Sequence, residues 1–414
     1  MQALAGFTAG QAESLRRAMS RRRSRELMGG FWEEFRTGAM ARGVPEATAE
    51  KVFAQVIAFS EFGFPKSHAA AFGLLAYQSA WLRHYHPVEF YVGLFNNQPM
   101  GFYSIDALGR DAQRNGIEIL LPDVNQSDVW CTVEPRGHAP GSGSGEQGAV
   151  RVGLGFVRHW SEETATATVQ EREQHGHYRS IGDFVRRAPP ALKRTAIEAL
   201  VWVGGCDGFG LTRRELLWQV GLWLPPKAEQ SGEGRGRRQL ELALDHPHEH
   251  LRFSGLAAHE RLLAEYATLG FSASCHPLSL VRDALPPGLT LNSKLDELTA
   301  GVKCRVAGLV VARQRPETAK GTVFLLVEDE TGMTNVIVRT DVYDRYRAAV
   351  RGEPFVVVSG KLAKDDGTVN VLAEEVEGLR LVGAHHAAPQ HDAPAPFSFL
   401  RAMRRVAPDS KDWG

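Results

Sequence analysis

The sequence predicts an α+β protein of several domains, mainly helical in its first half and ending in a five-stranded β-barrel. Three observations support this prediction. Apolar residues recur at helical spacing as far as about residue 223. A polar stretch rich in glycine and proline follows over residues 224–250. Beyond residue 295, short runs of valine and leucine alternate with turn residues, and the 414-residue chain is long enough for two or three cores.

Charge and cysteine content exclude some classes of protein. Basic and acidic residues number 48 each, so only a local basic patch would indicate a nucleic-acid partner. The four cysteines form no CxxC pair, which predicts buried thiols rather than a zinc site or disulfides. No apolar run reaches the length of a membrane span, and the first residues lack the apolar stretch of a signal peptide. We therefore expect a soluble, cytoplasmic protein.

The most distinctive stretch runs from Phe59 to Tyr103 and reads FSEFGFPKSHAAAFGLLAYQSAWLRHYHPVEFYVGLFNNQPMGFY. Ser67 stands where a helix N-cap is expected, and Pro87 should end that helix and open the next. Between them, one helix face carries Phe72, Leu75, Ala76, Ser79 and Leu82. The triplet Lys66-Ser67-His68 would then lie at a helix N-terminus, which suits an anion such as phosphate. The alternative is a capped helix in the core with incidental charges.

Basic and glycine-rich segments lie on either side of this stretch. The basic residues before it fit either a phosphate backbone or a solvated helix face: Arg16, Arg17, Arg21, Arg22, Arg23 and Arg25. After it, helices are predicted beyond Gly153 and Gly155 and on both sides of Gly204-Gly205. Such tandem helix-hairpin-helix units bring backbone amides close to phosphates and suit sequence-independent DNA binding. Glycine turns between helices are common, so spacing alone supports this only weakly.

Polar connections separate the predicted units. The segment EPRGHAPGSGSGEQG, between two short predicted strands, and residues 224–250 both have the composition of flexible loops. His246, His248 and His250 alternate in the second, but without cysteines nearby we expect no metal there.

The last folded unit begins near Leu295 and has the order three strands, one helix and two strands. This is the order of an OB-fold, which binds single strands through basic grooves and aromatic stacking. Candidate binding residues on its outer face are Arg313, Arg315, Lys320, Phe324 and Arg339. Acidic residues are about as numerous as basic ones in this unit, so a purely structural barrel is the alternative.

Several of these segments together resemble one family. FPKSHAAAF, YQSAWLRHYHP and LFNNQPMGFY resemble the fingers region of C-family bacterial DNA polymerases, and the ending resembles the error-prone branch more than the replicative alpha subunits. GLGFVRH, SIGDFVRRAP and LVWVGGCDGFGLTRRELLW resemble the region after the fingers, and VAGLVVARQRPETAKGTVFLLVEDETG resembles the OB domain. In one departure, His159 stands where the family usually has glycine.

The resemblance implies a division of the chain into five parts. These are the helical C-terminal part of the fingers (1–121), short strands with tandem helix-hairpin-helix units (122–223), a linker with connecting helices (224–294), the OB-fold (295–382) and a tail (383–414). We expect the tail to be disordered apart from one or two helical turns in FSFLRAMRR.

The resemblance also implies roles for particular residues. Those facing the deoxynucleoside triphosphate would be Lys66, Ser67, His68 and Arg83. Those holding DNA in the helix-hairpin-helix region would be Gly153, Gly155, Arg158, Gly204 and Gly205. The OB candidates would meet template single strand. Further partners in this family are the sliding clamp and accessory mutagenesis proteins, although no clamp-binding motif is evident.

The family's catalytic carboxylates lie in a palm domain, where they bind two Mg²⁺ ions. No such pair precedes the fingers motif here, and Asp106, Asp111, Asp123 and Asp128 do not form one. We therefore expect no catalytic residue and no cofactor in this chain, and Mg²⁺ only for a complete polymerase. The predicted function is the DNA-binding and nucleotide-facing portion of a translesion polymerase, inactive alone. The alternatives are a non-enzymatic DNA-binding module or remnant, and an unrelated OB protein, which would leave FPKSHAAAF unexplained.

Overall fold

The computed structural model describes ten stretches of the chain, namely residues 1–19, 28–61, 66–101, 103–135, 148–224, 251–316, 319–365, 367–381, 396–408 and 411–413. Three sequence predictions fall largely or wholly outside them. These are the loop EPRGHAPGSGSGEQG, the linker with its three histidines, and four arginines of the first basic cluster (Arg21, Arg22, Arg23 and Arg25).

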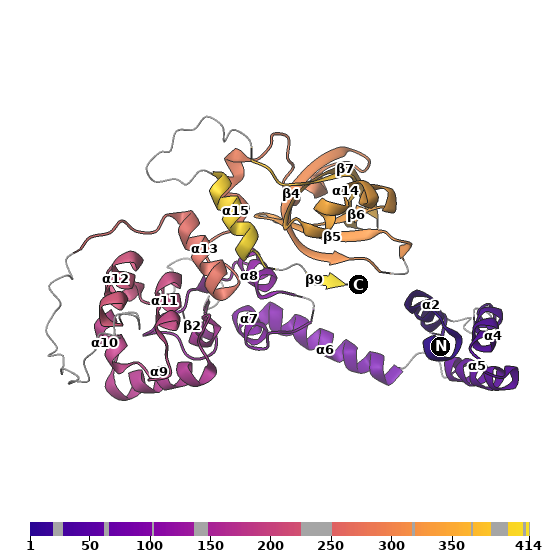
Figure 1. The fold of residues 1–414 in the computed structure, drawn as a ribbon, viewed down its shortest axis with the longest axis horizontal. Helices are drawn as coiled ribbons and strands as arrows, with labels where there is room; N and C mark the ends of the chain where they lie inside the picture. Colours follow the sequence, from indigo (N-terminus) through magenta and orange to yellow (C-terminus); the bar gives the residue numbers. More distant parts are fainter. Residues whose placement is uncertain are drawn as a thin grey trace, which may run out of the picture.

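The first helices form a small unit with its own core. They are α1 (Gln2–Ala5), α2 (Ala9–Met19), α4 (Trp32–Ala41) and α5 (Glu46–Glu61). Phe7, Phe35 and Phe53 are buried at its centre, with ring centroids 5.3 Å apart for Phe35 and Phe53. In Figure 1 this unit stands apart from the rest of the molecule and is joined to it by α6 (Lys66–Tyr85).

The helix α6 confirms the predicted ending but not a buried face. It ends at Tyr85, and Pro87 is the first residue of α7 (Pro87–Asn96), as expected. Its large apolar side chains are exposed in the described part of the chain: Phe72, Leu74, Leu75, Tyr77, Trp81, Leu82 and Tyr85. The alternative of a buried core helix is therefore wrong for this structure.

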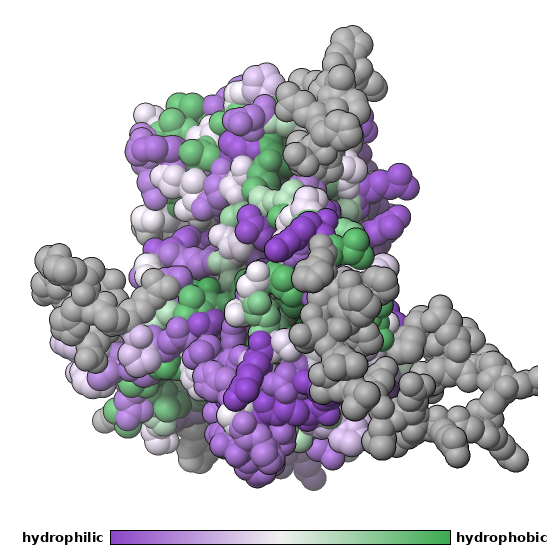
Figure 2. Space-filling view, turned by 90° about the vertical axis from the view of Figure 1, so that its left-hand side faces the viewer, coloured by the Kyte–Doolittle hydropathy of each residue, from purple (hydrophilic) through white to green (hydrophobic). Residues whose placement is uncertain are grey.

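A central unit follows, in which helices cover a small three-stranded sheet. Its strands β1 (Ile119–Leu120) and β3 (Ala149–Arg151) are parallel, and β2 (Thr132–Glu134) pairs antiparallel with β3. The helices are α7, α8 (Ile105–Arg114), α9 (Glu162–His175), α10 (Ile181–Arg187), α11 (Arg194–Val203) and α12 (Arg213–Trp223). One continuous apolar core holds these elements together. Figure 2 shows the outer face of this region, where hydrophilic residues cover most of the lower part and apolar residues form separate patches.

The second half of the chain forms the predicted barrel. Its strands are β4 (Lys303–Gln314), β5 (Val323–Asp329), β6 (Gly332–Val338), β7 (Phe355–Asp365) and β8 (Thr368–Gly378). The helix α14 (Thr340–Gly352) lies between β6 and β7, and β4 pairs with both β7 and β5, which closes the barrel in the order β5-β6-β8-β7-β4. This order of strands and helix confirms the OB-fold.

The tail contains more structure than the one or two helical turns expected in FSFLRAMRR. A helix of three turns, α15 (Pro396–Val406), packs on the molecule, and β9 (Lys411–Trp413) pairs in parallel with the end of β4. Phe399, Leu400 and Met403 are buried in an apolar cluster shared with α13 (Ala258–Leu269) and the barrel. We expected less helix in this segment because its apolar residues are few. Those residues nevertheless fall on one side of the helix, which lets it pack.

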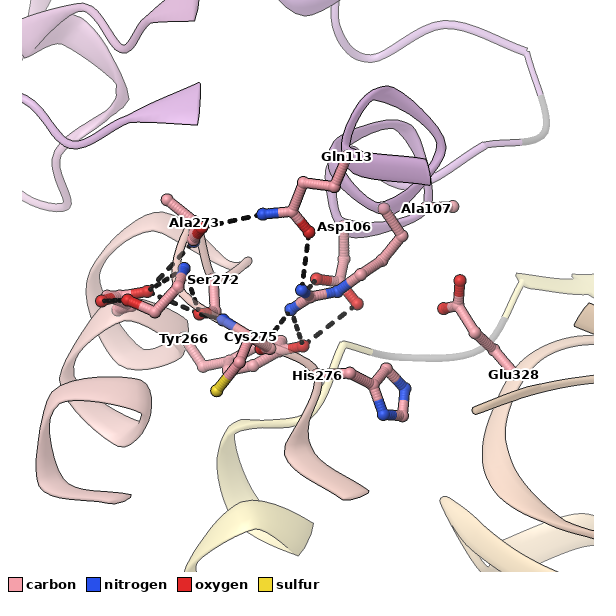
Figure 3. A network of polar contacts seen from close by, with 12 residues as sticks. Asp106, Ala107, Gln113, Tyr266, Ser272, Ala273, Cys275, His276 and Glu328 are labelled. Carbon is pink, nitrogen blue, oxygen red and sulfur yellow. Dashed lines mark hydrogen bonds and ion pairs between the residues drawn. The ribbon is translucent and has the colours of Figure 1, made fainter. Parts of the chain in front are cut away.

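A buried polar network joins α8 and α13 next to the barrel (Figure 3). Arg110 donates from Nη2 to the Cys275 carbonyl at 2.8 Å and to the Tyr266 hydroxyl at 3.1 Å. Arg114 donates from Nη1 to Glu328 Oε1 of β5 at 2.5 Å. Because Glu328 is buried, its pKa is raised to about 7. These contacts link the helical half of the molecule to the barrel.

His276 has a structural role in the same region. Its Nδ1 accepts a hydrogen bond from the Leu278 amide at 3.2 Å and caps the 3-10 helix η4 (Pro277–Ala284). Burial lowers its pKa well below the usual histidine range, so the ring is neutral at physiological pH.

Candidate nucleic-acid interface

The outer face of the barrel carries an apolar row across three strands. Valine and leucine alternate inward along β5 and β6, which leaves Phe324 and Ile337 facing outward. Phe324 pairs directly with Ile337, and Ile337 pairs with Leu372 of β8. Phe324 and Ile337 are half-buried and Leu372 is 39 % exposed, so the three side chains form an accessible surface. We call Phe324, Ile337 and Leu372 the apolar row.

Basic residues gather at the end of the barrel next to this row. Arg315 and Lys320 lie on the connection from β4 to β5, and Arg339 follows β6, whose last residue pairs with the first residue of β5. The Lys320 carbonyl accepts a hydrogen bond from Thr340 Oγ1 at 3.1 Å, which ties the connection to the end of β6. The Arg315 guanidinium lies 4.6 Å from the centre of the Tyr343 ring. The exposed Arg339 side chain pairs with Asp341 at 3.2 Å.

Arg313 differs from the other barrel candidates. Its Nε donates to the Val350 carbonyl at 2.8 Å and its Nη2 to the Glu353 carbonyl at 2.5 Å. These carbonyls lie at the C-terminal end of α14, where a helix leaves acceptors without intrahelical partners. The guanidinium therefore stabilises the helix end. The sequence had predicted Arg313 as a strand-binding residue.

Sequence reasoning missed Ile337 and Leu372, along with Asn335 and Asn370, which pair across β6 and β8. The alternation of inward and outward residues along each strand could have identified them. The register between strands was needed to show that they form one row with Phe324, and the sequence does not supply it.

The glycines expected in the first hairpin are packed against protein backbone. A side chain on Gly153 would place its Cβ 2.4 Å from the Val129 carbonyl oxygen, which explains the requirement for glycine. The Gly155 amide donates to the same Val129 carbonyl at 2.9 Å. Arg158 is exposed beside them. The Gly155 amide is therefore already hydrogen-bonded within the protein. It is not the free backbone donor for phosphate that we expected at this glycine.

The glycines of the second hairpin end α11. Gly204 has a φ of 97°, and the amides of Gly204 and Gly205 donate to the Val201 and Leu200 carbonyls at 3.1 and 2.8 Å. The exposed glycines of this turn are instead Gly208 and Gly210. The turn is held by Arg213, a buried side chain that donates from Nη2 to Asp207 Oδ2 at 2.8 Å.

The residues expected to face a nucleotide lie at two ends of one helix. Lys66 is the first residue of α6, and Ser67 is in its first turn rather than at the N-cap. The exposed His68 ring lies 4.5 Å from Phe72, while Arg83 pairs with Asp111 at 3.3 Å. His68 and Arg83 are about 22 Å apart along the axis at a rise of about 1.5 Å per residue. The structure does not bring Arg83 together with the Lys66-Ser67-His68 triplet.

Comparisons with known proteins agree with this architecture. A helix-hairpin-helix motif matches residues 116–216, and an OB-fold nucleic acid binding domain matches residues 304–379. An error-prone DNA polymerase of Anaeromyxobacter sp. (strain K) is 38 % identical over 92 % of this chain, and one of Corynebacterium efficiens is 37 % identical over 91 %. Over this length the chain is homologous to the error-prone DNA polymerases. The family resemblance of the sequence is thereby confirmed.

The chain spans about a third of the length of these polymerases, since the alignments cover 32 % of both relatives. Among solved structures, asparaginyl-tRNA synthetase from Pyrococcus horikoshii complexed with asparaginyl-adenylate matches 30 % of this chain and 29 % of its own, at 22 % identity and a TM-score of 0.21. Within the described residues, no helix is both long and apolar enough to cross a membrane.

The four aspartates considered for the polymerase metals each have local partners. Asp106 is buried beside Arg110, and Asp111 accepts from the Tyr91 hydroxyl at 2.6 Å. Asp123 Oδ1 accepts from the Asn125 amide at 2.7 Å, and Asp128 Oδ1 from the Val129 amide at 2.6 Å. These contacts give all four side chains a role in the fold.

Proposed function

We propose that this chain binds DNA as part of an error-prone polymerase and that the outer face of its barrel holds a single strand. The observation that carries the proposal is the apolar row on β5, β6 and β8 with cations at one end of it. Bases stack on exposed apolar and aromatic side chains without regard to sequence, while cations attract the phosphates. Arg315, Lys320 and Arg339 lie at the end of β5 and β6 where Phe324 begins the row.

We further propose that the complete enzyme carries out DNA-templated nucleotidyl transfer in translesion synthesis, with deoxynucleoside triphosphate as substrate. The support is the alignment of about nine-tenths of this chain with proteins named error-prone DNA polymerase. The N-terminus of α6 would then face the triphosphate, because unpaired amides at a helix start attract anions. Mg²⁺ would be bound by carboxylates outside this chain, and the sliding clamp and mutagenesis proteins would act on the assembled enzyme.

A binding measurement tests the first part. We would substitute Phe324→Ala with Leu372→Ala and measure the affinity for a fluorescent single-stranded oligonucleotide. Loss of stacking costs about 1–3 kcal/mol per base, so we expect a weakening of roughly fivefold or more. The control substitutes two exposed apolar residues of the N-terminal unit, Leu4→Ala with Met40→Ala. Equal affinities for the two variants would contradict the proposed role of the barrel face.

A primer-extension assay tests the second part. We expect the purified chain to bind a primed template but not to extend it with Mg²⁺ and all four nucleotides. Extension that persists through purification would show that this chain contains an active site, and the four aspartates would then be substituted one by one.

A further inference from the structure

A basic groove lies between α15 and the segment that leaves the barrel after β8. It has a volume of about 960 Å³ and an apolar base that includes Leu379, Leu381 and Leu400. Four arginines line it, namely Arg380, Arg401, Arg404 and Arg405. Among the described residues, no carboxylate lines the groove. Apart from Leu379, the residues that line the groove lie outside both stretches matched by the nucleic-acid-binding models, which cover residues 116–216 and 304–379.

The fold holds the groove in place. The apolar side of α15 is anchored by Phe399 and Met403, which are 2 % and 0 % exposed in the cluster shared with α13 and the barrel. The other side of the helix therefore carries its arginines outward. Arg404 is fixed by hydrogen bonding to the Leu379 carbonyl at 3.2 Å and by pairing with Glu353 at 3.1 Å. Arg404 therefore loses little side-chain entropy when a ligand binds.

The remaining arginines are available to an anionic ligand. Arg380, Arg401 and Arg405 are exposed, and none of them forms an ion pair with another described residue. The whole chain has no net charge, so this group is a local excess of positive charge. Guanidinium groups match phosphate oxygens in geometry, and several along one groove fit an extended polyanion better than a single small anion.

We propose that this groove binds the phosphodiester backbone of DNA. In Figure 1, α15 lies between α13 and the barrel, so a strand in the groove would extend the path from the barrel toward the helical unit. The proposal rests on the proposed DNA-binding function and adds a third contact region to it. An acidic protein segment is the competing occupant, and it would not give the response to nucleic acid described next.

The test compares two matched pairs of substitutions in the full chain. Arg401→Ala with Arg405→Ala removes two arginines one helical turn apart on α15, and Arg347→Ala with Arg351→Ala removes an equally spaced, exposed pair on α14. Both variants lose the same charge. We would measure the affinity for a single-stranded oligonucleotide and for a duplex over a range of salt concentrations.

Each lost phosphate contact lowers the slope of log affinity against log salt by about 0.7 for single strands and about 0.9 for duplex. For the two arginines of the α15 variant, we therefore expect the slope to fall by about 1.4 for single strands or about 1.8 for duplex. The slope of the α14 variant should match that of the unaltered chain. Whichever form of DNA shows the loss is the form that the groove binds. Arg401→Lys with Arg405→Lys should retain most of the slope, which separates a charge effect from a folding defect.

The failures of the two proposals can be told apart. If the unaltered chain binds neither form of DNA, the proposed function fails. If the unaltered chain binds DNA but the α15 and α14 variants show equal slopes, the groove proposal is overturned and the DNA-binding function stands.

Discussion

The helices α6 and α15 show how differently two helices of one chain can be used. The sequence of α6 is rich in motifs and strongly helical, yet its large apolar side chains are exposed, as far as 69 % for Tyr77. The segment of α15 was expected to form only one or two helical turns in an otherwise disordered tail, yet Met403 is completely buried. Within this chain, a strong sequence signal for a helix therefore does not indicate that the helix is packed.

The difference lies in how the apolar residues are distributed around each helix. On α15, Leu400 and Met403 fall on one side, and the arginines occupy the other, so the helix can pack on one surface. On α6, Phe72, Leu74 and Tyr77 point in different directions. A helix that is apolar on all sides needs protein around it, and the described residues cover little of α6.

The largest expected effect is the loss of stability when an aromatic ring is removed from α15, compared with the removal of one from α6. Phe399→Ala should lower the free energy of unfolding by about 3–5 kcal/mol, because it leaves a cavity in a closed cluster. Phe72→Ala removes a side chain that is 59 % exposed, and it should change stability by no more than about 0.5 kcal/mol. Urea unfolding of both variants measures the difference. Equal losses would mean that α6 is packed as firmly as α15.

A second prediction concerns Glu328 of β5, which accepts from Arg114 of α8 where the helical half of the molecule meets the barrel. Burial raises the pKa of Glu328 to about 7 from a usual 4.5, so between these values the folded chain keeps a proton that the unfolded chain releases. This group therefore stabilises the fold fully below about pH 4.5, and its contribution falls as pH rises toward 7. The total is about 3 kcal/mol at about 1.36 kcal/mol per pKa unit.

Glu328→Gln isolates that contribution. The stability of the unaltered chain minus that of the variant should decline between pH 4.5 and about 7. The difference between the two proteins is needed because His276 also titrates differently in the folded and unfolded chain. Burial lowers the pKa of His276, so its contribution to stability is lost as pH falls below the usual histidine value near 6.5, opposite to the trend for Glu328. Arg110, Arg114 and Asp106 surround the same joint and stay unchanged in both proteins. A flat difference would mean that Arg114 keeps Glu328 ionised.

The third prediction separates two neighbouring arginines of the barrel. Arg313→Ala should lower the free energy of unfolding by about 1.5–3 kcal/mol, because it removes hydrogen bonds from a charged group to two carbonyls of α14. Arg315→Ala should leave stability nearly unchanged and reduce the salt slope of single-strand binding by about 0.7. Measuring stability and binding on both variants checks this, and the opposite pattern would reverse our assignment.

The smallest effect is expected at His159. Its φ is 70°, a backbone conformation that suits glycine, and glycine is the residue that we expected there from the family resemblance. His159→Gly should raise the free energy of unfolding by about 0–1 kcal/mol, since relief of about 1–2 kcal/mol is partly offset by the flexibility of glycine in the unfolded chain. Thermal unfolding measures the shift, and a clear loss of stability would show that the imidazole makes a favourable contact.

The sequence predicted well what depends on neighbours along the chain. The break at Pro87 and the order of strands in the barrel were both visible in it. It could not show which donors were already occupied, as in Gly155, Gly205 and Arg313, because their partners lie elsewhere in the fold. The apolar row depended in the same way on pairing between strands.

The short strand β9 has a practical consequence for the experiments above. It pairs with the end of β4, with Trp413 opposite Gln314, so it lies beside the connection that carries Arg315 and Lys320. A purification tag placed next to β9 would crowd the path proposed for single-stranded DNA. A fluorophore at the same place would instead report the arrival of the strand directly. The N-terminal helices, which form a separate unit in Figure 1, are the better position for a tag.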